Sequence, residues 1–341
     1  MLSYVIVGSG YRAQYYGRVA QTWSERFRAV FLCRSAEKAA KMKRETGLDS
    51  VLTAEAAEAF SPDFIVVAVD KGHIADVAEE WALRGYPVVT ETPLADTEEK
   101  LERIWKLAES GARIVCCEQY HRYPLLAAGL EAVRQGLIGT PRSAYFSALH
   151  DYHAASLIRR SLMTGKEEYT LRGVRSVSPA VETDSRYGAV LDGRTTEEVR
   201  DLVLVMFESG KSAVYDFAPL QYRSYIRSRH ITVRGDRGEW SDTVLYCLDQ
   251  KNRPLRQVLM PEIPERYQCL DTQYLRDLRK TWRPELCPDT LQDEYAIATI
   301  LLDMAEYLSG APSPYPLWEA VEDARFWLRL QKAVQQNAAG C

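Results

Sequence analysis

A glycine-rich turn near the start of the chain restricts the possible folds most strongly. The segment VIVGSGYRA places Gly8, Gly10 and Ala13 between a β-branched run at residues 4–7 and a helix predicted over residues 12–23. The first glycine permits a tight turn, the second lets a diphosphate approach the backbone, and a small third residue allows close packing of helix and strand. Amides at the helix N-terminus then face the phosphates. The segment therefore predicts a dinucleotide-binding turn, with an ordinary glycine turn as the alternative.

The pattern around this turn predicts an α/β fold. Short apolar runs alternate with amphipathic helices, which is typical of a doubly wound parallel sheet buried on both faces. The runs cover residues 4–7, 29–33, 64–69, 87–90 and 113–117, and the helices cover 12–23, 36–45, 73–84 and 97–110. We expect a dinucleotide-binding domain over residues 1–120.

Beyond about residue 140 the pattern changes, which predicts a second domain over residues 121–341. Runs joined by short turns indicate a mostly antiparallel sheet, with strands at 143–149, 202–207, 212–217, 230–233 and 244–248. Two long helices follow, at 290–308 with Asp289 as N-cap and at 317–336. Residues 166–195 are rich in charge, Gly and Ser, and we expect a long loop there.

Composition excludes several classes of protein. The chain has 341 residues, a net charge of -4, 46% hydrophobic and 26% charged residues, which suits two globular domains and not a disordered chain. The acidic balance argues against nucleic-acid binding, and no apolar run is long enough for a membrane span. Seven cysteines, without CxxC spacing, favour free thiols. The first residues lack a cationic leader, so we expect a cytoplasmic protein without a secretory signal.

The end of the second predicted strand bears on cofactor choice. An NAD-specific site places a carboxylate there to bind the ribose, but this chain has Cys33, Arg34 and Ser35. Arg34 can face a 2′-phosphate and Ser35 can hydrogen-bond to it, which favours NADP over NAD. The alternative is that Arg34 is a solvated loop residue and cofactor choice is made elsewhere.

Four ordered motifs resemble the Gfo/Idh/MocA oxidoreductases: the glycine turn, DKGH, GYPVVTETPLA and EQYHRYP, with a looser continuation in HDYHAASLIRR. The resemblance implies an N-terminal Rossmann domain and a C-terminal α/β domain with an open, mostly antiparallel sheet. It also implies a bound nicotinamide cofactor, a sugar, sugar acid or cyclitol substrate, and homodimers or homotetramers that pack through the sheet. The cofactor-contacting positions we expect are Gly8, Gly10, Tyr11, Arg12, Ala13, Arg34, Ser35, Val69, His73 and Glu91.

One position departs from the family. Where the family has Glu-Lys-Pro, with a lysine that assists proton transfer at the substrate hydroxyl, this chain has Glu91, Thr92 and Pro93. A threonine hydroxyl neither carries a positive charge nor acts as a base near neutral pH. Thr92 can still hydrogen-bond to a substrate hydroxyl or to the nicotinamide carboxamide. Another residue must carry the proton, the reaction must differ, or catalysis has been lost.

Several side chains are candidates for the missing proton carrier. Lys71 follows the FIVVAV strand, at the edge where such sheets bind ligands. His121 follows the last parallel strand. His153 matches, by resemblance, the family's substrate-facing histidine, and histidine titrates near neutral pH. Asp151 would share a strand face with His153 and orient an imidazole, and Tyr120 and Tyr152 are weaker candidates because free tyrosine has a pKa of about 10.

Structural roles compete with these functional ones. His73 can simply cap a helix, and His121 can brace the hinge between domains. His150, Asp151 and His153 are too few for a metal site, so none is predicted. Two further groups have structural alternatives that we prefer: His230 with Arg227, Arg229 and Arg234 at a solvated sheet edge, and Cys116 with Cys117 packed in a buried run.

Three functions are consistent with this sequence. The first is an NAD(P)-dependent dehydrogenase acting on a sugar, sugar acid or cyclitol hydroxyl. The second is a redox-neutral lyase or glycosidase with a resident cofactor, and the third is a dinucleotide-binding sensor that has lost catalysis. The chain has 20 tyrosines, which suit stacking on sugar rings or an oligomer interface equally well; they include Tyr145, Tyr152, Tyr169, Tyr187, Tyr222 and Tyr225.

Overall fold

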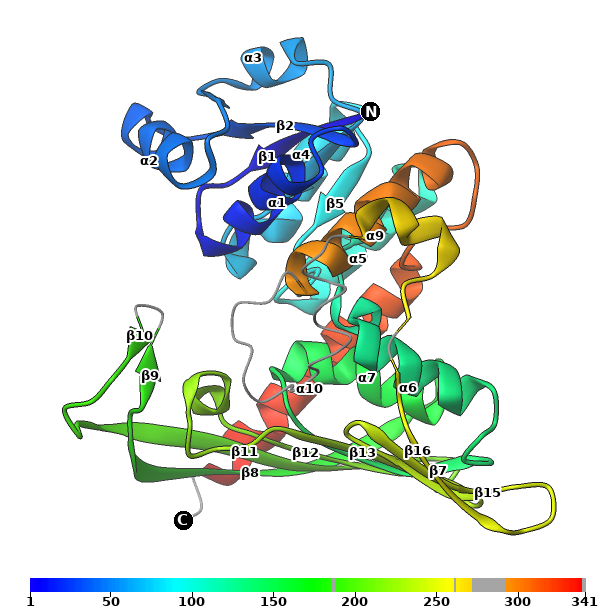
Figure 1. Cartoon of the computed structure of the whole chain (residues 1–341). Helices are drawn as coiled ribbons and strands as arrows, with labels where there is room; N and C mark the ends of the chain where they lie inside the picture. The colour runs from blue at the N-terminus through cyan, green and yellow to red at the C-terminus, as the bar shows by residue number, and fades with distance from the viewer. Residues whose placement is uncertain (186–187, 261, 272–291, 339–341) are drawn as a thin grey trace. The chain divides into compact units, whose positions relative to one another are not determined.

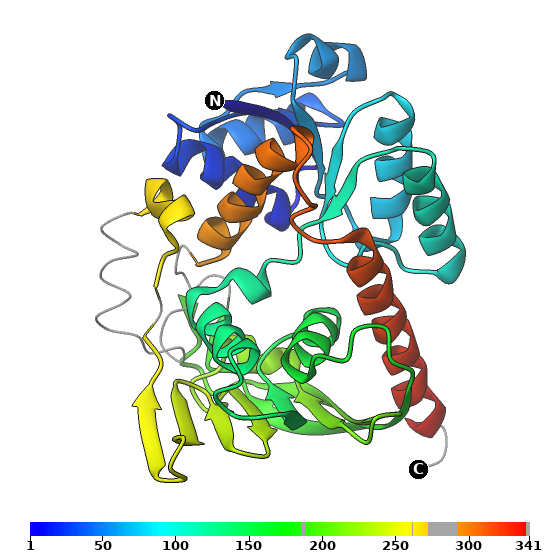
Figure 2. The ribbon, with the colours of Figure 1, turned by 90° about the vertical axis from the view of Figure 1, so that its right-hand side faces the viewer.

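The structure is a computed structural model that describes residues 1–185, 188–260, 262–271 and 292–338, with side chains described to residue 335. The described chain forms two compact units (Figures 1 and 2). The first contains residues 1–123, 264–271 and 292–325; the second contains the described parts of 124–263 and 326–338. The single boundary expected after residue 120 differs from this arrangement, because the chain returns to the first unit near its C-terminal end. Asp289, Tyr187, Cys287 and Cys341 lie outside the described residues.

The first unit is built on the predicted parallel sheet. Its strands are β1 (Leu2–Val7), β2 (Phe27–Leu32), β3 (Ser50–Val51), β4 (Phe64–Val67), β5 (Val88–Thr90) and β6 (Ile114–Cys116). They lie in the order β3-β2-β1-β4-β5-β6, and every neighbouring pair is parallel. All four residues of β4 are buried, as a sheet covered on both faces requires. The order reverses between β1 and β4, and this is the point at which doubly wound sheets bind ligands.

Local capping explains where the helices of this unit begin. The helices are α1 (Tyr11–Thr22), α2 (Ala36–Thr46), α3 (Ala54–Ala59), α4 (Ile74–Leu83) and α5 (Glu98–Glu109). Ser35, Thr53 and Thr97 each accept a backbone hydrogen bond that caps the following helix. Helix α1 differs, because Gly10 precedes it and caps it with no side-chain hydrogen bond.

A late segment completes the first unit. Helix α9 (Gln292–Leu308) packs against α1, and Arg18 Nε donates to Glu294 Oε1 at 2.5 Å between the two helices. The indole nitrogen of Trp23 donates to the carbonyl of Leu270 at 3.2 Å. The helix predicted over residues 290–308 is therefore part of the nucleotide-binding unit and not of the second domain.

The second unit has an open, mostly antiparallel sheet, as expected. Its strand order is β16-β15-β14-β13-β7-β12-β11-β8, and only the β7–β12 pair is parallel among those described. The strands are β7 (Pro141–Ser147), β8 (Tyr169–Val181), β11 (Thr195–Phe207), β12 (Ser212–Phe217), β13 (His230–Gly235), β14 (Gly238–Ser241), β15 (Val244–Leu248) and β16 (Pro254–Val258). Two further short strands, β9 (Asp184–Ser185) and β10 (Gly188–Ala189), pair with each other in antiparallel orientation.

Helices cover one face of this sheet. They are α6 (Pro124–Arg134), α7 (Asp151–Leu162) and the second half of α10 (Leu317–Ala338) (Figure 1). Gly129 lets α6 approach the sheet closely, because a Cβ there would lie 2.1 Å from the Trp240 ring. No helix in the described part of the chain is long and apolar enough to cross a membrane.

Two predictions about this unit are wrong. The loop expected over residues 166–195 contains β8, which pairs with β11 along all 13 of its residues. Its polar residues obscured the strand, because only one face of this sheet is covered. The second error concerns His230: β13 pairs with β7 and β14, so this histidine is not on an edge strand.

Candidate functional site

Gly8 and Gly10 meet different physical demands. Gly8 has φ +136°, and a Cβ at that position would lie 2.2 Å from the carbonyl oxygen of Ala68. Gly10 has no heavy atom within 4 Å of its would-be Cβ, so space remains next to the turn. Ala13 is fully buried beneath them. At Gly8 the backbone lies so close to the Ala68 carbonyl that only glycine fits, whereas Gly10 leaves open space suited to a diphosphate.

The first turn of α1 has the properties of an anion site. It contains no acidic residue, and the N-cap residue Gly10 has no side chain that could cap it. Its backbone amides are therefore available to phosphate oxygens. The Arg12 side chain donates hydrogen bonds to Glu91 and Asp293, so at the turn this residue offers only its backbone amide. The Tyr11 hydroxyl is hydrogen-bonded to the Tyr15 hydroxyl at 2.8 Å.

The candidate side chains after β2 and β4 are exposed or half-buried. Arg34 is exposed immediately beyond β2, while Ser35 uses its hydroxyl to cap α2 by accepting from the Lys38 amide at 3.3 Å. After β4, Lys71 is exposed in a 3-10 turn (Lys71–His73) that follows the half-buried Val69. His73 is the N-cap residue of α4, with its Nδ1 3.8 Å from Asp70 Oδ1.

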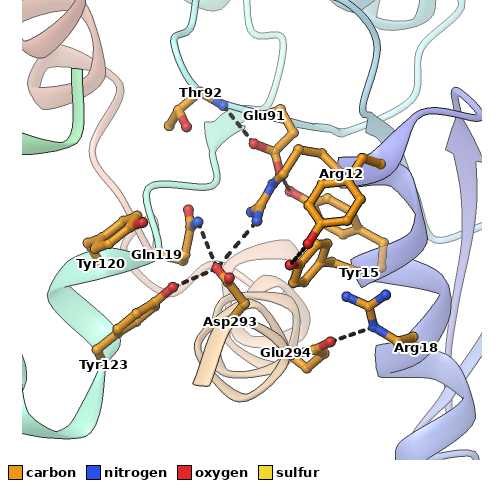
Figure 3. Close-up of polar contacts among 12 residues, drawn as sticks. Arg12, Tyr15, Arg18, Glu91, Thr92, Gln119, Tyr120, Tyr123, Asp293 and Glu294 are labelled. Atoms are coloured by element: carbon orange, nitrogen blue, oxygen red, sulfur yellow. Dashed lines mark hydrogen bonds and ion pairs between the residues drawn. The ribbon is translucent and has the colours of Figure 1, made fainter. Parts of the chain in front are cut away.

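Side chains of α1 form hydrogen bonds with Glu91, the first residue after β5. Glu91 is 5% exposed, and its Oε1 accepts hydrogen bonds from Arg12 Nε at 3.1 Å and from the Tyr16 hydroxyl at 3.0 Å. Its Oε2 accepts from the Thr92 amide at 3.3 Å (Figure 3). The Thr92–Pro93 peptide is cis, and the Thr92 hydroxyl is buried without a hydrogen-bond partner in the described structure.

Asp293 at the start of α9 joins three elements. Its Oδ1 accepts from Arg12 Nη1 at 3.3 Å, from Gln119 Nε2 at 3.1 Å and from the Tyr123 hydroxyl at 2.6 Å (Figure 3). Burial raises the pKa of Asp293, but the Arg12 charge and the donated hydrogen bonds outweigh burial and lower the pKa below its ordinary value. Sequence reasoning missed Asp293 because nothing local links it to residues about 170 positions earlier, and it missed Gln119 although that residue belongs to the EQYHRYP motif.

His121 lies in a brace within the first unit. It is buried after β6, and its Nε2 accepts a hydrogen bond from Arg122 Nε at 3.0 Å. Arg122 also contacts the Tyr267 hydroxyl and, at 3.0 Å, the Asp303 carboxylate. An acceptor at Nε2 places the neutral imidazole proton on Nδ1. The surroundings of His121 therefore favour its structural alternative over proton transfer through Nε2.

The second unit has its own aromatic cluster. His150 is the N-cap residue of α7, and its backbone amide donates to the Tyr222 hydroxyl at 2.8 Å. Its ring lies 5.6 Å from the Tyr152 ring, 4.8 Å from Tyr222 and 5.8 Å from Phe217, measured between centroids. The His153 ring lies 4.5 Å from the Tyr152 ring.

The expected geometry at Asp151 and His153 is wrong. β7 ends at Ser147, and both residues lie in the first turn of α7, where positions two apart point in different directions. The Asp151 carboxylate instead accepts from Trp327 Nε1 at 3.1 Å, from the Tyr152 amide at 2.9 Å and from the Gln331 amide nitrogen. Burial raises the pKa of Asp151, and these hydrogen bonds only partly offset that effect.

The tandem cysteines are packed and not reactive. Cys116 and Cys117 are both buried beside the end of β6, and burial raises the pKa of each thiol above its ordinary value. A thiol with a raised pKa is a poor nucleophile near neutral pH. The structure therefore supports the packing interpretation for this pair.

Residues 2–119 match the family described as oxidoreductase family, NAD-binding Rossmann fold. The match covers the parallel sheet of the first unit, which is the part of the chain that resembles the Gfo/Idh/MocA oxidoreductases most closely in its motifs. No curated protein sequence matches the chain. The match to an NAD-binding family agrees with the predicted nicotinamide dinucleotide cofactor and with the predicted oxidoreductase class.

Solved structures resemble the whole chain. An oxidoreductase from Agrobacterium radiobacter in complex with NAD+, L-tartaric acid and magnesium has a TM-score of 0.69 at 13% identity, over 99% of this chain and 96% of that one. The WlbA dehydrogenase from Bordetella pertussis in complex with NADH and UDP-GlcNAcA has a TM-score of 0.68 at 14% identity, over 98% and 96%. Biliverdin reductase from Synechocystis, in complex with biliverdin and NADP+, has a TM-score of 0.66 at 16% identity, over 98% and 99%. At such identities the resemblance establishes the fold alone.

Proposed function

We propose that this chain is an NAD(P)-dependent dehydrogenase that transfers hydride between a nicotinamide cofactor and a carbon bearing a hydroxyl group in a sugar, sugar acid or cyclitol. The observation that carries the proposal is the turn at Gly8 and Gly10, within a domain that matches an NAD-binding family. The dehydrogenase from Bordetella pertussis, whose fold is similar, was solved with a nucleotide sugar acid. The biliverdin reductase shows that the same fold also serves other substrates.

The residues at the turn fit a dinucleotide. Gly10 leaves the space that a diphosphate needs, and the uncapped first turn of α1 supplies amides. When bound, the cofactor supplies hydride chemistry, and the protein supplies orientation and charge. Arg34 and Ser35 stand at the end of β2, where a carboxylate would favour NAD, and they support a preference for NADP. Val69 and His73, after β4, remain proposed contacts on the nicotinamide side.

We assign the proton transfer to His153. The candidate is a buried imidazole on the first turn of α7, beside the Tyr152 ring, and histidine carries protons near neutral pH. Lys71 is the alternative, because it follows β4 at the ligand-binding edge of the sheet. Asp151 stays in the proposal as a positioning residue, since its carboxylate holds the first turn of α7 through the Tyr152 amide. Thr92 contributes a hydrogen bond through its unpartnered hydroxyl.

The experiment measures the stoichiometry of the cofactor during turnover of a panel of sugars, sugar acids and cyclitols. Net reduction of NADP+ or NAD+ in step with product supports the dehydrogenase. His153→Gln should lower kcat by about 100-fold with the dinucleotide Kd unchanged, and Lys71→Gln is the matched variant at the alternative position. An unchanged kcat in His153→Gln would overturn the assignment of this residue.

Thr92 favours a second candidate, a redox-neutral lyase or glycosidase. In that reaction the sugar is oxidised transiently, eliminates its substituent and takes the hydride back, so cofactor is not consumed. Such chemistry needs a base placed differently from the family lysine, and Thr92 is no base. Product formation without net cofactor change would support this candidate. A chain that binds the dinucleotide tightly, but whose cofactor no substrate reduces or oxidises, would be a sensor.

The exposed face of the second sheet supports a homodimer or homotetramer. Along β11, Val203 and Val205 are buried, while Leu202, Leu204 and Met206, which alternate with them, are about 42% exposed. An apolar strip of this kind is typical of an interface. We propose that copies of the chain pack through this face, and that the protein works in the cytoplasm on a small-molecule substrate.

A further inference from the structure

At the end of β5, one arginine forms ion pairs with two carboxylates. Arg12 forms ion pairs with Glu91 at 3.1 Å and with Asp293 at 3.3 Å. No second cation forms an ion pair with either carboxylate in the described part of the chain. One guanidinium therefore faces two carboxylates, and this cluster of Arg12, Glu91 and Asp293 has a net charge of -1 when both acids are ionised.

The contacts of both acids are of the kind that carboxylates accept. Asp293 has a lowered pKa, because the charge of Arg12 and the hydrogen bonds it receives outweigh its burial. The contacts of Glu91 come from donors only: Arg12, the Tyr16 hydroxyl and the Thr92 amide. An ionised carboxylate accepts such hydrogen bonds through both oxygens, whereas a protonated one would have to donate.

The cluster lies at the edge of the sheet that a dinucleotide occupies. Arg12 is in the first turn of α1, directly after the glycine turn, and Glu91 directly follows β5. Figure 3 shows the Arg12 side chain between Glu91 and Asp293, with Thr92 beside Glu91. Ligands of doubly wound sheets bind outside these strand ends. A dinucleotide that binds at this edge would have the net negative charge of the cluster close to it.

We propose that the cluster of Arg12, Glu91 and Asp293 makes the enzyme bind the oxidised cofactor more tightly, relative to the reduced one, than an uncharged cluster would. The oxidised nicotinamide ring carries a positive charge and the reduced ring does not, while the rest of the two molecules is the same. A nearby negative charge stabilises only the charged ring by Coulomb attraction. Asp293 is thus a specificity-determining residue for the redox state of the cofactor. This inference rests on the proposed function.

The experiment compares the Kd values of the oxidised and reduced forms, for NADP+ and NADPH and for NAD+ and NADH, by calorimetry. Asp293→Asn removes one charge, and the ratio of Kd(oxidised) to Kd(reduced) should rise about three- to fivefold. Tyr123→Phe is the matched control, because it removes a hydrogen bond to Asp293 without changing charge. This control should leave the ratio unchanged.

A structural disturbance would weaken both forms alike, so the ratio isolates the charge. If Asp293→Asn binds neither form, Glu91→Gln removes the same charge from the other end of the cluster and should raise the ratio in the same direction. A ratio that stays at the wild-type value in the variant that binds overturns the inference but leaves the dehydrogenase proposal intact. Failure of the wild-type protein to bind any of the four dinucleotides would instead overturn the proposed function.

Discussion

The hydroxyl of Tyr16 donates a 3.0 Å hydrogen bond to Oε1 of Glu91. This contact ties the middle of α1 to the residue that precedes Thr92. The helix whose first turn we propose to bind the diphosphate therefore also contacts the segment that resembles the family's Glu-Lys-Pro motif. A change in the first turn of α1 is therefore expected to affect the segment around Thr92 through the contacts of Tyr16 and Arg12 with Glu91.

The two glycines of the turn should respond differently to alanine. Gly8→Ala places a Cβ 2.2 Å from the Ala68 carbonyl at φ +136°, and it should lower the free energy of unfolding by about 3 kcal/mol. Gly10→Ala meets open space and should change that energy by less than about 1 kcal/mol, but it should raise the dinucleotide Kd at least about tenfold because it fills the phosphate position. Chemical denaturation and calorimetry measure the two effects, and equal destabilisation of both variants would contradict this division of roles.

Arg34 should govern the preference for NADP. Arg34→Ala removes an exposed guanidinium beyond β2, and we expect the Kd for NADPH to rise about tenfold, since hydrogen bonds between charged groups contribute about 1.5 to 3 kcal/mol. The Kd for NADH, which has no 2′-phosphate, should not change. Lys38→Ala on α2 is the control. Parallel losses for both dinucleotides would mean that Arg34 does not recognise the 2′-phosphate.

Thr92→Lys should restore the lysine of the family motif. If only the proton carrier is missing, this variant should show higher dehydrogenase activity than the wild type, measured as cofactor reduction with the sugar panel. Thr92→Val is the matched control: the hydroxyl it removes has no hydrogen-bond partner in the described structure, so its Tm should stay within about 2 °C of the wild type. No gain in Thr92→Lys, with both variants folded, would point to a different reaction or to lost catalysis.

Asp151 should make stability depend on pH. Its pKa is raised above the ordinary 3.8, mainly by burial, so the folded state holds its proton to higher pH than the unfolded state. The contribution of this group to stability is therefore greatest below that ordinary value and decreases as the pH rises through the raised pKa. Asp151→Asn should flatten this part of the curve of Tm against pH, measured upward from pH 4. An identical slope in both proteins would show that another group is responsible.

The exposed face of β11 should hold copies of the chain together. Leu204→Asp introduces a charge into the apolar strip and should shift an oligomer toward monomer in analytical ultracentrifugation. Leu83→Asp, at an exposed apolar position on α4, should leave the sedimentation unchanged. A wild-type protein that sediments as a monomer at all concentrations would contradict the proposed interface.

The sequence predicted the first unit well because its signals are local. A glycine turn, buried apolar runs and capping residues such as Ser35 and Thr97 all act within a few positions, and each predicted strand of that sheet is present. In the second unit, β8 was missed because its exposed face has the composition of a loop. The start of α7 was read as the end of a strand because only residues 148–150 separate it from β7.

Long-range contacts were out of reach of the sequence. Arg12 was expected at the cofactor, but nothing near it indicates that its side chain binds Asp293, which is 281 positions away. The position of His121 after β6 made it a candidate, but its Nε2 already accepts a hydrogen bond from the adjacent Arg122. Partners of this kind arise from tertiary packing, and no local spacing in the sequence indicates them.

The return of α9 to the first unit has a consequence for biosynthesis. Domains of a nascent chain generally fold from the N-terminus as they leave the ribosome, but α1 packs against a helix that ends at Leu308. The apolar and charged surface of α1 that α9 covers therefore stays exposed to solvent while the ribosome translates nearly all of the second unit. Premature termination anywhere in that stretch would release a polypeptide whose first unit lacks α9, so that the α1 surface stays exposed.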